Sequence, residues 1–283
     1  MEIVEVPRAV TESEAAEWKN QRVTAHTPTD LPDEFIAVDA STKTPFLLQA
    51  RADKTDLEGQ REAFMQYRKQ FSGVVRAGGM RSKSGTFGFV APSAVMQRLA
   101  PSAASWAWQH PQSHTAICEY AATLARTLDE KGPENARRGN SDARASLNPD
   151  WRLGDTCWTS GIVNDTAGLY YHHDRNNIPG TWSAMLVARA GTRGGHLHVV
   201  DYDLTLRARD GDLLYFPGMN LMHGVTPITS SLKGGYRFTS VYYAVKRFVG
   251  APTSKDALRA ASSRRSGLED DLIARQREQG MIK

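Results

Sequence analysis

The stretch WSAMLVARAGTRGGHLHVVDYDLTLRARDGDLLYF, residues 182–216, alternates short β-rich runs with glycine-containing turns. Gly194-Gly195 and Asp210-Gly211 are turn-forming pairs, and each run between them has the length of a single strand. Together with the flanking segments, five strands are predicted: Thr156–Val163, Trp182–Ala188, His196–Val200, Asp212–Phe216 and Arg237–Val245. Many short strands joined by regular turns predict an antiparallel sandwich or jelly roll.

The first half of the chain has a helical pattern instead. Thr11 is a candidate N-cap, and Glu14 is placed to close a capping box with it. Apolar periodicity and turn residues predict helices over Glu12–Asn20, Asp56–Phe71 and His114–Lys131, and a loop over Glu134–Asn148. We therefore expect one α+β domain over residues 1–250, in which a helical and mixed part at 1–150 buttresses a jelly-roll core at 151–250.

Length and composition exclude several protein classes. The chain has 283 residues, 40% hydrophobic and 23% charged, which is ordinary for a globular protein. No apolar run approaches the roughly 18–20 residues that cross a bilayer, and the N-terminus lacks the pattern of an export signal. Cys118 and Cys157 alone cannot form a disulfide framework. We expect a protein of the reducing cytoplasm, with association to a nucleoid as an option, that is not secreted.

Basic residues concentrate at the C-terminal end. The whole chain carries a net charge of +4, and the segment from Lys246 to Lys283 has nine Lys and Arg against five acids, so this segment alone accounts for that excess. A basic tail over 251–283, predicted to be helical, can bind a polyanion such as nucleic acid. A solvated helix explains the tail equally well.

A candidate metal site lies in Tyr171-His-His-Asp-Arg-Asn-Asn177. On a strand His172 and Asp174 project from the same face, while His173 points away. One more histidine completes a 2-His-1-carboxylate triad, the ligand set that binds Fe(II) and leaves coordination positions open. His223, in a turn next to Gly224, is the best candidate for it. The alternative is a surface histidine paired with Asp174.

Arg237 is the second unusual residue. It begins a run in which Arg237, Thr239, Val241 and Tyr243 share one face of a predicted strand. A buried guanidinium is costly without an anionic partner, and its fork fits a carboxylate in two places. A dicarboxylate cosubstrate supplies such a partner. The alternative is an edge strand with Arg237 in solvent.

These features together resemble the Fe(II)/2-oxoglutarate dioxygenase superfamily, and within it the TET/JBP family of DNA base hydroxylases. The resemblance covers about 90 residues, Thr156 to Lys246. It implies a double-stranded β-helix, a jelly-roll variant, with Fe(II) on His172, Asp174 and His223. It also implies 2-oxoglutarate and O2 as cosubstrates, with the distal carboxylate of 2-oxoglutarate on Arg237 and Thr239.

The resemblance implies further roles, each with a structural alternative. His198, in Leu197-His-Val199, matches a cosubstrate histidine, or else is a core histidine. Arg81 matches an arginine near the cosubstrate, or else lies in an exposed basic loop that contacts phosphates. Asn177 matches an asparagine that faces the target base, or else forms a turn. Tyr243 matches an aromatic residue that stacks on the base, or else belongs to the core.

Two departures from the family limit the resemblance. Animal members carry a cysteine-rich region that two cysteines cannot rebuild, so this chain is similar to the compact forms of phages, protists or fungi. A base-contacting histidine expected two residues after Tyr243 is here Val245, which puts the identity of the base in doubt.

The function that the resemblance implies is hydroxylation of the methyl group of 5-methylcytosine in DNA, on a base flipped out of the duplex. The alternatives are thymine hydroxylation, a small-molecule or protein hydroxylase with the same iron site, and a cupin-like jelly roll without metal. Basic side chains available for DNA phosphates are Arg137, Arg138, Arg144, Arg264 and Arg265.

Overall fold

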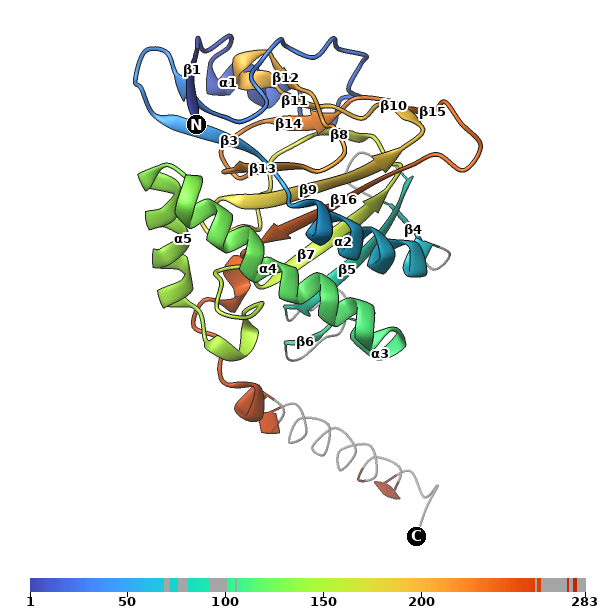
Figure 1. The fold of residues 1–283 in the computed structure, drawn as a ribbon. Helices are drawn as coiled ribbons and strands as arrows, with labels where there is room; N and C mark the ends of the chain where they lie inside the picture. Colours follow the sequence, from blue (N-terminus) through green and yellow to red (C-terminus); the bar gives the residue numbers. More distant parts are fainter. Residues whose placement is uncertain are drawn as a thin grey trace.

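The computed structural model describes residues 1–68, 72–75, 81–91, 101–104, 106–257, 259–260, 274 and 277–278. Two β-sheets face each other in it, and three of the helices cover the outer side of the larger sheet (Figure 1). All five strands predicted from the sequence are present: Asp212–Phe216 has the predicted ends, and the other four have shifted ends.

The large sheet combines strands from both halves of the chain. Its order is β1 (Glu2–Val6), β2 (Phe35–Asp39), β3 (Pro45–Arg51), β13 (Asp212–Phe216), β9 (Ser183–Ala190), β16 (Tyr236–Tyr243), β7 (Ser160–Asp165), β5 (Arg81–Val90) and β4 (Ser72–Val75), with β6 (Ser102–Ala103) paired to β5. β3 and β5 come from the part predicted as helical and mixed, yet they pair directly with core strands β13 and β7. The first half therefore extends the sheet as well as buttressing it.

The small sheet lies opposite the middle of the large one. Its order is β12 (Leu204–Leu206), β11 (Leu197–Val199), β14 (His223–Val225) and β8 (Leu169–His172), and a separate hairpin joins β10 (Thr192–Gly194) to β15 (Ile228–Ser230). Leu197 and Val199 pack against Met185 and Val187 of β9, so the apolar core between the sheets is continuous. Two facing sheets of this kind form a jelly roll.

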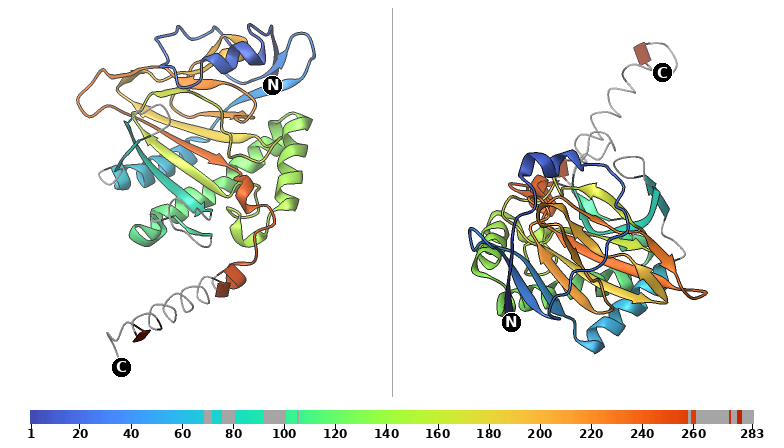
Figure 2. Two further views of the ribbon diagram at one scale, coloured as in Figure 1. Left: turned by 180° about the vertical axis from the view of Figure 1, so that it is seen from behind. Right: turned by 90° about the horizontal axis from the view of Figure 1, so that it is seen from above.

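Three helices of the first half, over residues 54–67, 111–131 and 134–146, pack on the outer face of the large sheet (Figures 1 and 2). Ile117 and Leu124 belong to the buried stripe of the longest helix, and their carbonyls accept hydrogen bonds from Tyr242 of β16 and Tyr215 of β13. The α-helices are α1 (Glu12–Glu17), α2 (Lys54–Tyr67), α3 (Trp106–Gln109), α4 (Pro111–Lys131) and α5 (Glu134–Ser146); three-residue helical turns lie at Pro149–Trp151, Val200–Tyr202 and Lys246–Phe248.

The helix predictions are confirmed for three segments. The capping box of Thr11 and Glu14 is present on α1. The second predicted helix begins earlier than expected, after its N-cap Asp53, and residues 69–71 at its predicted end lie outside the described residues. α4 begins at Pro111 because proline suits the first helical position.

The loop prediction for Glu134–Asn148 is wrong, because α5 occupies most of this segment. Its polar composition suggested a loop, but alanine and arginine are good helix formers. Ala136 and Ala143 are buried seven positions apart on one face, which is enough to attach a polar helix to the core. At Gly139 the helix comes so close to Gly180 that a Cβ atom would lie 2.1 Å from its carbonyl oxygen.

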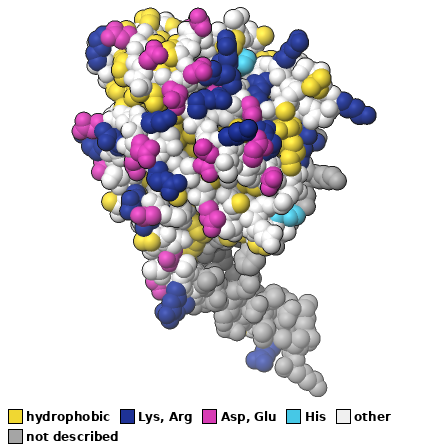
Figure 3. Space-filling view, viewed as in Figure 1, with side chains coloured by type: hydrophobic (Ala, Val, Ile, Leu, Met, Phe, Trp, Pro, Cys, Tyr) yellow, Lys and Arg dark blue, Asp and Glu magenta, His cyan; other side chains and the backbone are white. Residues whose placement is uncertain are grey.

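The N-terminal segment covers the outer face of the small sheet. Ala15 and Val23 pack there against Tyr171 and Met222. No helix among the described residues is long and apolar enough to cross a membrane. On the face that carries the helices of the first half, acidic and basic side chains are interspersed (Figure 3), so this face presents no single-sign patch.

Candidate metal centre

Two of the predicted ligands lie opposite each other in the small sheet. His172 ends β8, and His223 begins β14 rather than lying in a turn as predicted, and the two residues are register partners. Directly opposed residues project from the same face of a sheet. Their ring centroids are 4.4 Å apart, and the ligand atoms of His172, Asp174 and His223 all lie within 4.8 Å of one another.

Hydrogen bonds to the backbone fix both rings. Nδ1 of His172 is 2.8 Å from the carbonyl oxygen of Tyr170, and Nδ1 of His223 is 2.9 Å from that of Leu221. Because a carbonyl only accepts, both Nδ1 atoms donate, which leaves the Nε2 atom of each ring as the one that can bind a metal. Burial lowers the pKa of His223 to about 4, so this imidazole is neutral at pH 7.

Asp174 completes the group from a position just beyond the strand. Its carboxylate oxygens lie 3.6 Å from Nε2 of His172 and 3.9 Å from Nε2 of His223. Two imidazoles and a carboxylate that converge in this way fit a divalent iron ion. His173, which strand alternation predicted to point away, also lines the cavity, since the strand has already ended.

Gly218 allows Asp174 to take this position. The Asp174 amide donates to the carbonyl of Gly218 at 2.9 Å, which brings the two residues together. A Cβ atom on Gly218 would lie 2.3 Å from Oδ2 of Asp174. Only glycine therefore leaves room for the carboxylate.

We predict that Gly218→Ala weakens iron binding by about 10–100-fold, because the added methyl group pushes the carboxylate of Asp174 out of its position beside the two histidines. Metal content after dialysis against graded Fe(II) measures the effect. Gly59→Ala on α2 is the matched control, since nothing lies within 4 Å of its added methyl group. Equal iron affinity in both variants would contradict the prediction.

A cavity of about 390 Å³ opens between the sheets beside the three ligands. It has the size of a small-ligand site. Thr239, Asn177 and Tyr243, each predicted from the sequence, line it together with His172, Asp174 and His223, and so does Asn164 of β7, which sequence reasoning missed. Nδ2 of Asn164 lies 3.5 Å from Oγ1 of Thr239.

Arg237 is buried in the middle of the large sheet. β16 pairs with strands on both sides, so the edge-strand alternative is excluded, and the residue is 1% exposed. Among the described residues its Nε and Nη2 atoms have no hydrogen-bond partner. Burial, and to a lesser extent the charge of Arg189, lower the pKa of Arg237 to about 9, so it remains cationic at pH 7. An unpaired buried cation of this kind is expected where an anion binds.

Asn177, beyond the end of β8, and Tyr243, at the end of β16, both line the cavity. The side chain of Asn177 is buried, and its Nδ2 donates to Oγ of Ser183 at 3.0 Å. Its backbone forms an isolated bridge with Val245, just beyond Tyr243. Lys19 and Arg175 are exposed cations on the same lining, and neither was predicted.

His198 lies away from the cavity. Leu197 faces the cavity, so its neighbour His198 projects from the opposite face of β11. There its Nδ1 lies 2.7 Å from the Tyr171 hydroxyl and its Nε2 lies 3.1 Å from Asp203. This arrangement gives no support to a cosubstrate contact and agrees with the alternative of a core histidine.

His198 also belongs to a second group of potential ligands with His26 and Asp203. The rings of His26 and His198 are stacked, 4.0 Å between centroids and 16° between planes. Nitrogen lone pairs in two nearly parallel, stacked rings do not point at one common ion. The rings of His172 and His223, by contrast, are tilted by 51° to each other. The second group is therefore a hydrogen-bonded cluster in this structure.

The remaining predicted residues are not among those that line the cavity, or they lie outside the part of the chain that the structure describes. Arg81 begins strand β5 rather than a loop, and its side chain lies outside the described part of the chain, as do Arg264 and Arg265. Arg137, Arg138 and Arg144 are on α5, and Arg144 is paired with Asp155 at 2.6 Å. These three arginines are not among the residues that line the cavity.

Comparison with solved structures identifies the fold. A structure described as NgTET1 in complex with 5mC DNA superposes with a TM-score of 0.58 at 16% sequence identity, over 90% of this chain and 100% of that one. The chain has the fold of NgTET1. The α+β class and the double-stranded β-helix, which the resemblance implied, are thereby confirmed.

Other matches are weaker or partial. A 2OG-Fe(II) oxygenase family oxidoreductase from Burkholderia pseudomallei (14% identity, 72% of this chain and 87% of that one) and the viral collagen prolyl hydroxylase of Paramecium Bursaria Chlorella virus-1 (13%, 71% and 97%) give TM-scores of 0.48 and 0.41. Among curated proteins, the sulfite reductase (NADPH) hemoprotein beta-component of Aeromonas hydrophila is 34% identical over 173 residues, 60% of this chain. The chain spans 27% of the length of that relative. No family model matches the chain.

Proposed function

We propose that this chain is an Fe(II)/2-oxoglutarate-dependent dioxygenase that hydroxylates the methyl group of 5-methylcytosine in DNA. The observation that carries the proposal is the pairing of two features: three convergent candidate ligands, and the buried cation of Arg237, with two unbonded nitrogen atoms, on β16 of the facing sheet. The first feature fits Fe(II) and the second fits a dicarboxylate. The fold shared with NgTET1 supports the DNA substrate.

The residues present fit the metal and the cosubstrate. Nε2 of His172, the carboxylate of Asp174 and Nε2 of His223 would hold Fe(II), which with O2 and 2-oxoglutarate supplies the oxidising chemistry. Arg237 would bind the distal carboxylate of the cosubstrate, with the Thr239 hydroxyl as a second donor. Thr239 lines the cavity between the two sheets, and Arg237, which is not among the lining residues, lies two positions before Thr239 on the same face of β16.

Asn177 favours cytosine over thymine. Because its Nδ2 donates to Ser183, its Oδ1 is left to accept a hydrogen bond from a ligand. Cytosine presents an N4 amine donor at the position where thymine presents the O4 acceptor. Tyr243, which lines the same cavity, offers an aromatic ring on which a flipped base can stack.

DNA would approach over the cavity mouth. A methyl group inside a duplex cannot reach the cavity, so the base must leave the stack at a cost of a few kcal/mol. Lys19 and Arg175 are exposed on the lining and can contact phosphates. Because such contacts release counterions, binding to DNA is expected to weaken steeply with added salt.

Nucleoside mass spectrometry tests the substrate. The protein, Fe(II), 2-oxoglutarate and ascorbate are incubated with a 5-methylcytosine duplex, and in parallel with a duplex whose only methylated base is thymine. We expect 5-hydroxymethylcytosine from the first duplex and no 5-hydroxymethyluracil from the second. Asn177→Leu, which removes the acceptor at similar volume, is expected to lower the yield by about 10–100-fold.

The other outcomes separate the alternatives. 5-Hydroxymethyluracil from the thymine duplex alone would identify a thymine hydroxylase. Succinate formed without any change in either base would retain the dioxygenase and reject DNA as the substrate. Neither succinate nor product, with iron verified in the protein, would leave a jelly-roll binding protein.

A further inference from the structure

Arg189 lies directly beside Arg237 in the large sheet. The two residues are register partners on β9 and β16, so their side chains project from the same face. Like charges opposed in this way destabilise a sheet. Burial lowers the pKa of Arg189 as well, and the nearby charges of Asp210 and Asp212 act against this lowering. Two neighbouring, partly or fully buried cations therefore cost folding free energy, which an anion bound beside them would offset.

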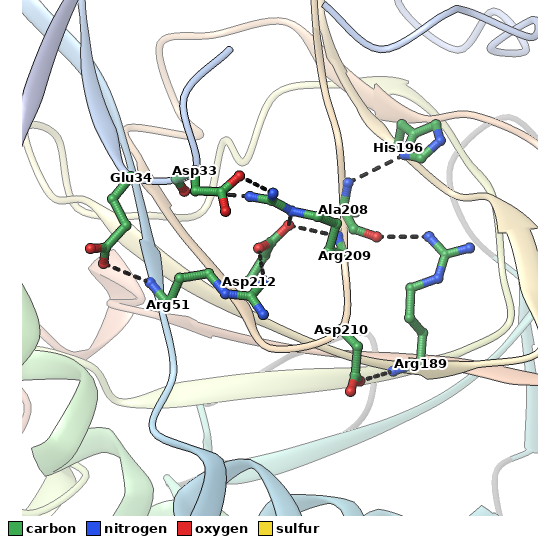
Figure 4. Close-up of polar contacts among 9 residues, drawn as sticks. All are labelled: Asp33, Glu34, Arg51, Arg189, His196, Ala208, Arg209, Asp210 and Asp212. Carbon is green, nitrogen blue, oxygen red and sulfur yellow. Dashed lines mark hydrogen bonds and ion pairs between the residues drawn. The ribbon is translucent and has the colours of Figure 1, made fainter. Parts of the chain in front are cut away.

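Within the described part of the chain, the guanidinium of Arg189 donates to three carbonyl groups and forms no ion pair, although the charges of Asp210 and Asp212 lie near enough to act on it. Its Nη1 donates to Gly194 at 2.9 Å and to Ala208 at 2.7 Å, and its Nη2 donates to Thr192 at 2.7 Å. Arg189 therefore ties residues 191–195, which comprise the short strand β10 and one glycine on each side and are called the 191–195 turn below, to the segment before β13. Figure 4 shows the bond to Ala208. Carbonyls satisfy its donors but leave its positive charge in place.

The turn that Arg189 holds packs against the side chain of Arg237. Gly195 has a φ of +71°, and a Cβ atom there would lie 2.5 Å from Cδ and 2.6 Å from Nε of Arg237. Gly195 is thus in direct contact with the guanidinium stem that carries the unpaired Nε and Nη2 atoms. A shift of this turn would move the wall against which Arg237 rests.

A polar network makes the other anchor of Arg189 rigid. Ala208 donates its amide to Nδ1 of His196 at 3.2 Å, and Oδ1 of Asp210 accepts the backbone amide of Arg189 at 2.7 Å (Figure 4). Nearby, Oδ2 of the fully buried Asp212 accepts the amide of Arg209 at 2.6 Å. Arg189 therefore bonds to a fixed segment on one side and to the turn over Arg237 on the other.

We propose that Arg189 is a positioning residue for the anion that Arg237 binds. It holds the 191–195 turn against Arg237 and adds a second positive charge that favours a dianion over a monoanion. This inference rests on the proposed function, since it takes the anion to be 2-oxoglutarate, and it assigns no contact between Arg189 and the cosubstrate.

The test is the affinity for 2-oxoglutarate, measured by calorimetry without turnover, and its KM and kcat with substrate present. Arg189→Met is expected to raise the dissociation constant and KM on the order of tenfold, with kcat nearly unchanged at saturation. Arg189→Lys keeps a charge but cannot reach three carbonyls, so it is expected to fall between. Arg193→Met, an exposed arginine of the same hairpin, is the matched control and is expected to bind like the wild type.

Arg237→Met separates this inference from the function on which it rests. If Arg237→Met leaves the affinity for 2-oxoglutarate unchanged, the proposed site itself is wrong. If Arg237→Met weakens binding but Arg189→Met and Arg189→Lys bind like Arg193→Met, only the positioning role is overturned. A lower kcat with unchanged KM in a folded Arg189→Met protein would also overturn the positioning role, because that role predicts a higher KM for 2-oxoglutarate with kcat nearly unchanged.

Discussion

The His223→Ala variant is expected to lose stoichiometric iron and at least about 100-fold of its turnover. In the proposed site His223 is one of two imidazole ligands, and the bond from its Nδ1 to the carbonyl of Leu221 fixes its ring. The small alanine side chain leaves one histidine and one carboxylate, too few to retain Fe(II) against dialysis. Metal analysis of the dialysed protein and succinate formation measure the two losses.

A histidine outside the cavity provides the comparison. His110, just before α4, is not among the cavity residues, and His110→Ala is expected to keep its iron. Iron retained at one equivalent in His223→Ala, or lost equally from both variants, would show that this histidine is not a ligand.

The Arg237→Met variant is expected to gain stability and lose cosubstrate binding at the same time. In the protein without ligand, a buried cation with two unpaired nitrogen atoms opposes folding. Methionine of similar length removes that cost, so we expect the free energy of unfolding to rise by about 1–3 kcal/mol. The affinity for 2-oxoglutarate should fall by about 100-fold, because the carboxylate loses its charged partner.

Thermal unfolding with and without 2-oxoglutarate shows both effects in one experiment. Saturating ligand stabilises the wild type, by about 2.7 kcal/mol at 100 times its dissociation constant, and should leave Arg237→Met nearly unchanged. Arg237→Lys keeps the charge but not the fork, and is expected to show an intermediate ligand shift. An equal ligand shift in wild type and Arg237→Met would mean that Arg237 faces no carboxylate.

Two of the three candidate ligands, and Arg237, could be singled out because their signals are local. His172 and Asp174 are two residues apart, and an arginine within a β-branched strand is conspicuous wherever the strand lies. The site around them could not be predicted in the same way. Gly218 matters only because the fold brings it to Asp174, 44 positions away in the direction of the C-terminus, as the bond between their backbones shows.

His198 shows where strand alternation alone is insufficient. Alternation indicates that Leu197 and His198 face opposite ways, but not which of them faces the cavity. The register decides it: Val199 is paired with His223, which faces the cavity, so Leu197 does too and His198 faces outward. Register depends on the neighbouring strand, and β14 was too short to be recognised from the sequence.

The strands of the first half and α5 were missed for related reasons. β2 and β3 are short and buried by strands from the other half of the chain, so their stability is tertiary. α5 buries little more than alanine side chains, which leaves no apolar periodicity to read. In both cases the decisive contacts join segments that are distant in sequence.

The central claim is that the three-ligand site inserts oxygen from O2 into the methyl group of a DNA base. Incubation under heavy-isotope O2 with Fe(II), 2-oxoglutarate and a 5-methylcytosine duplex, followed by mass spectrometry of the nucleosides, tests it most directly. The proposed function predicts 5-hydroxymethylcytosine that carries the heavy oxygen atom, with an equivalent of succinate, and neither product from His223→Ala. Unlabelled hydroxymethylcytosine, or labelled product undiminished in His223→Ala, would contradict it.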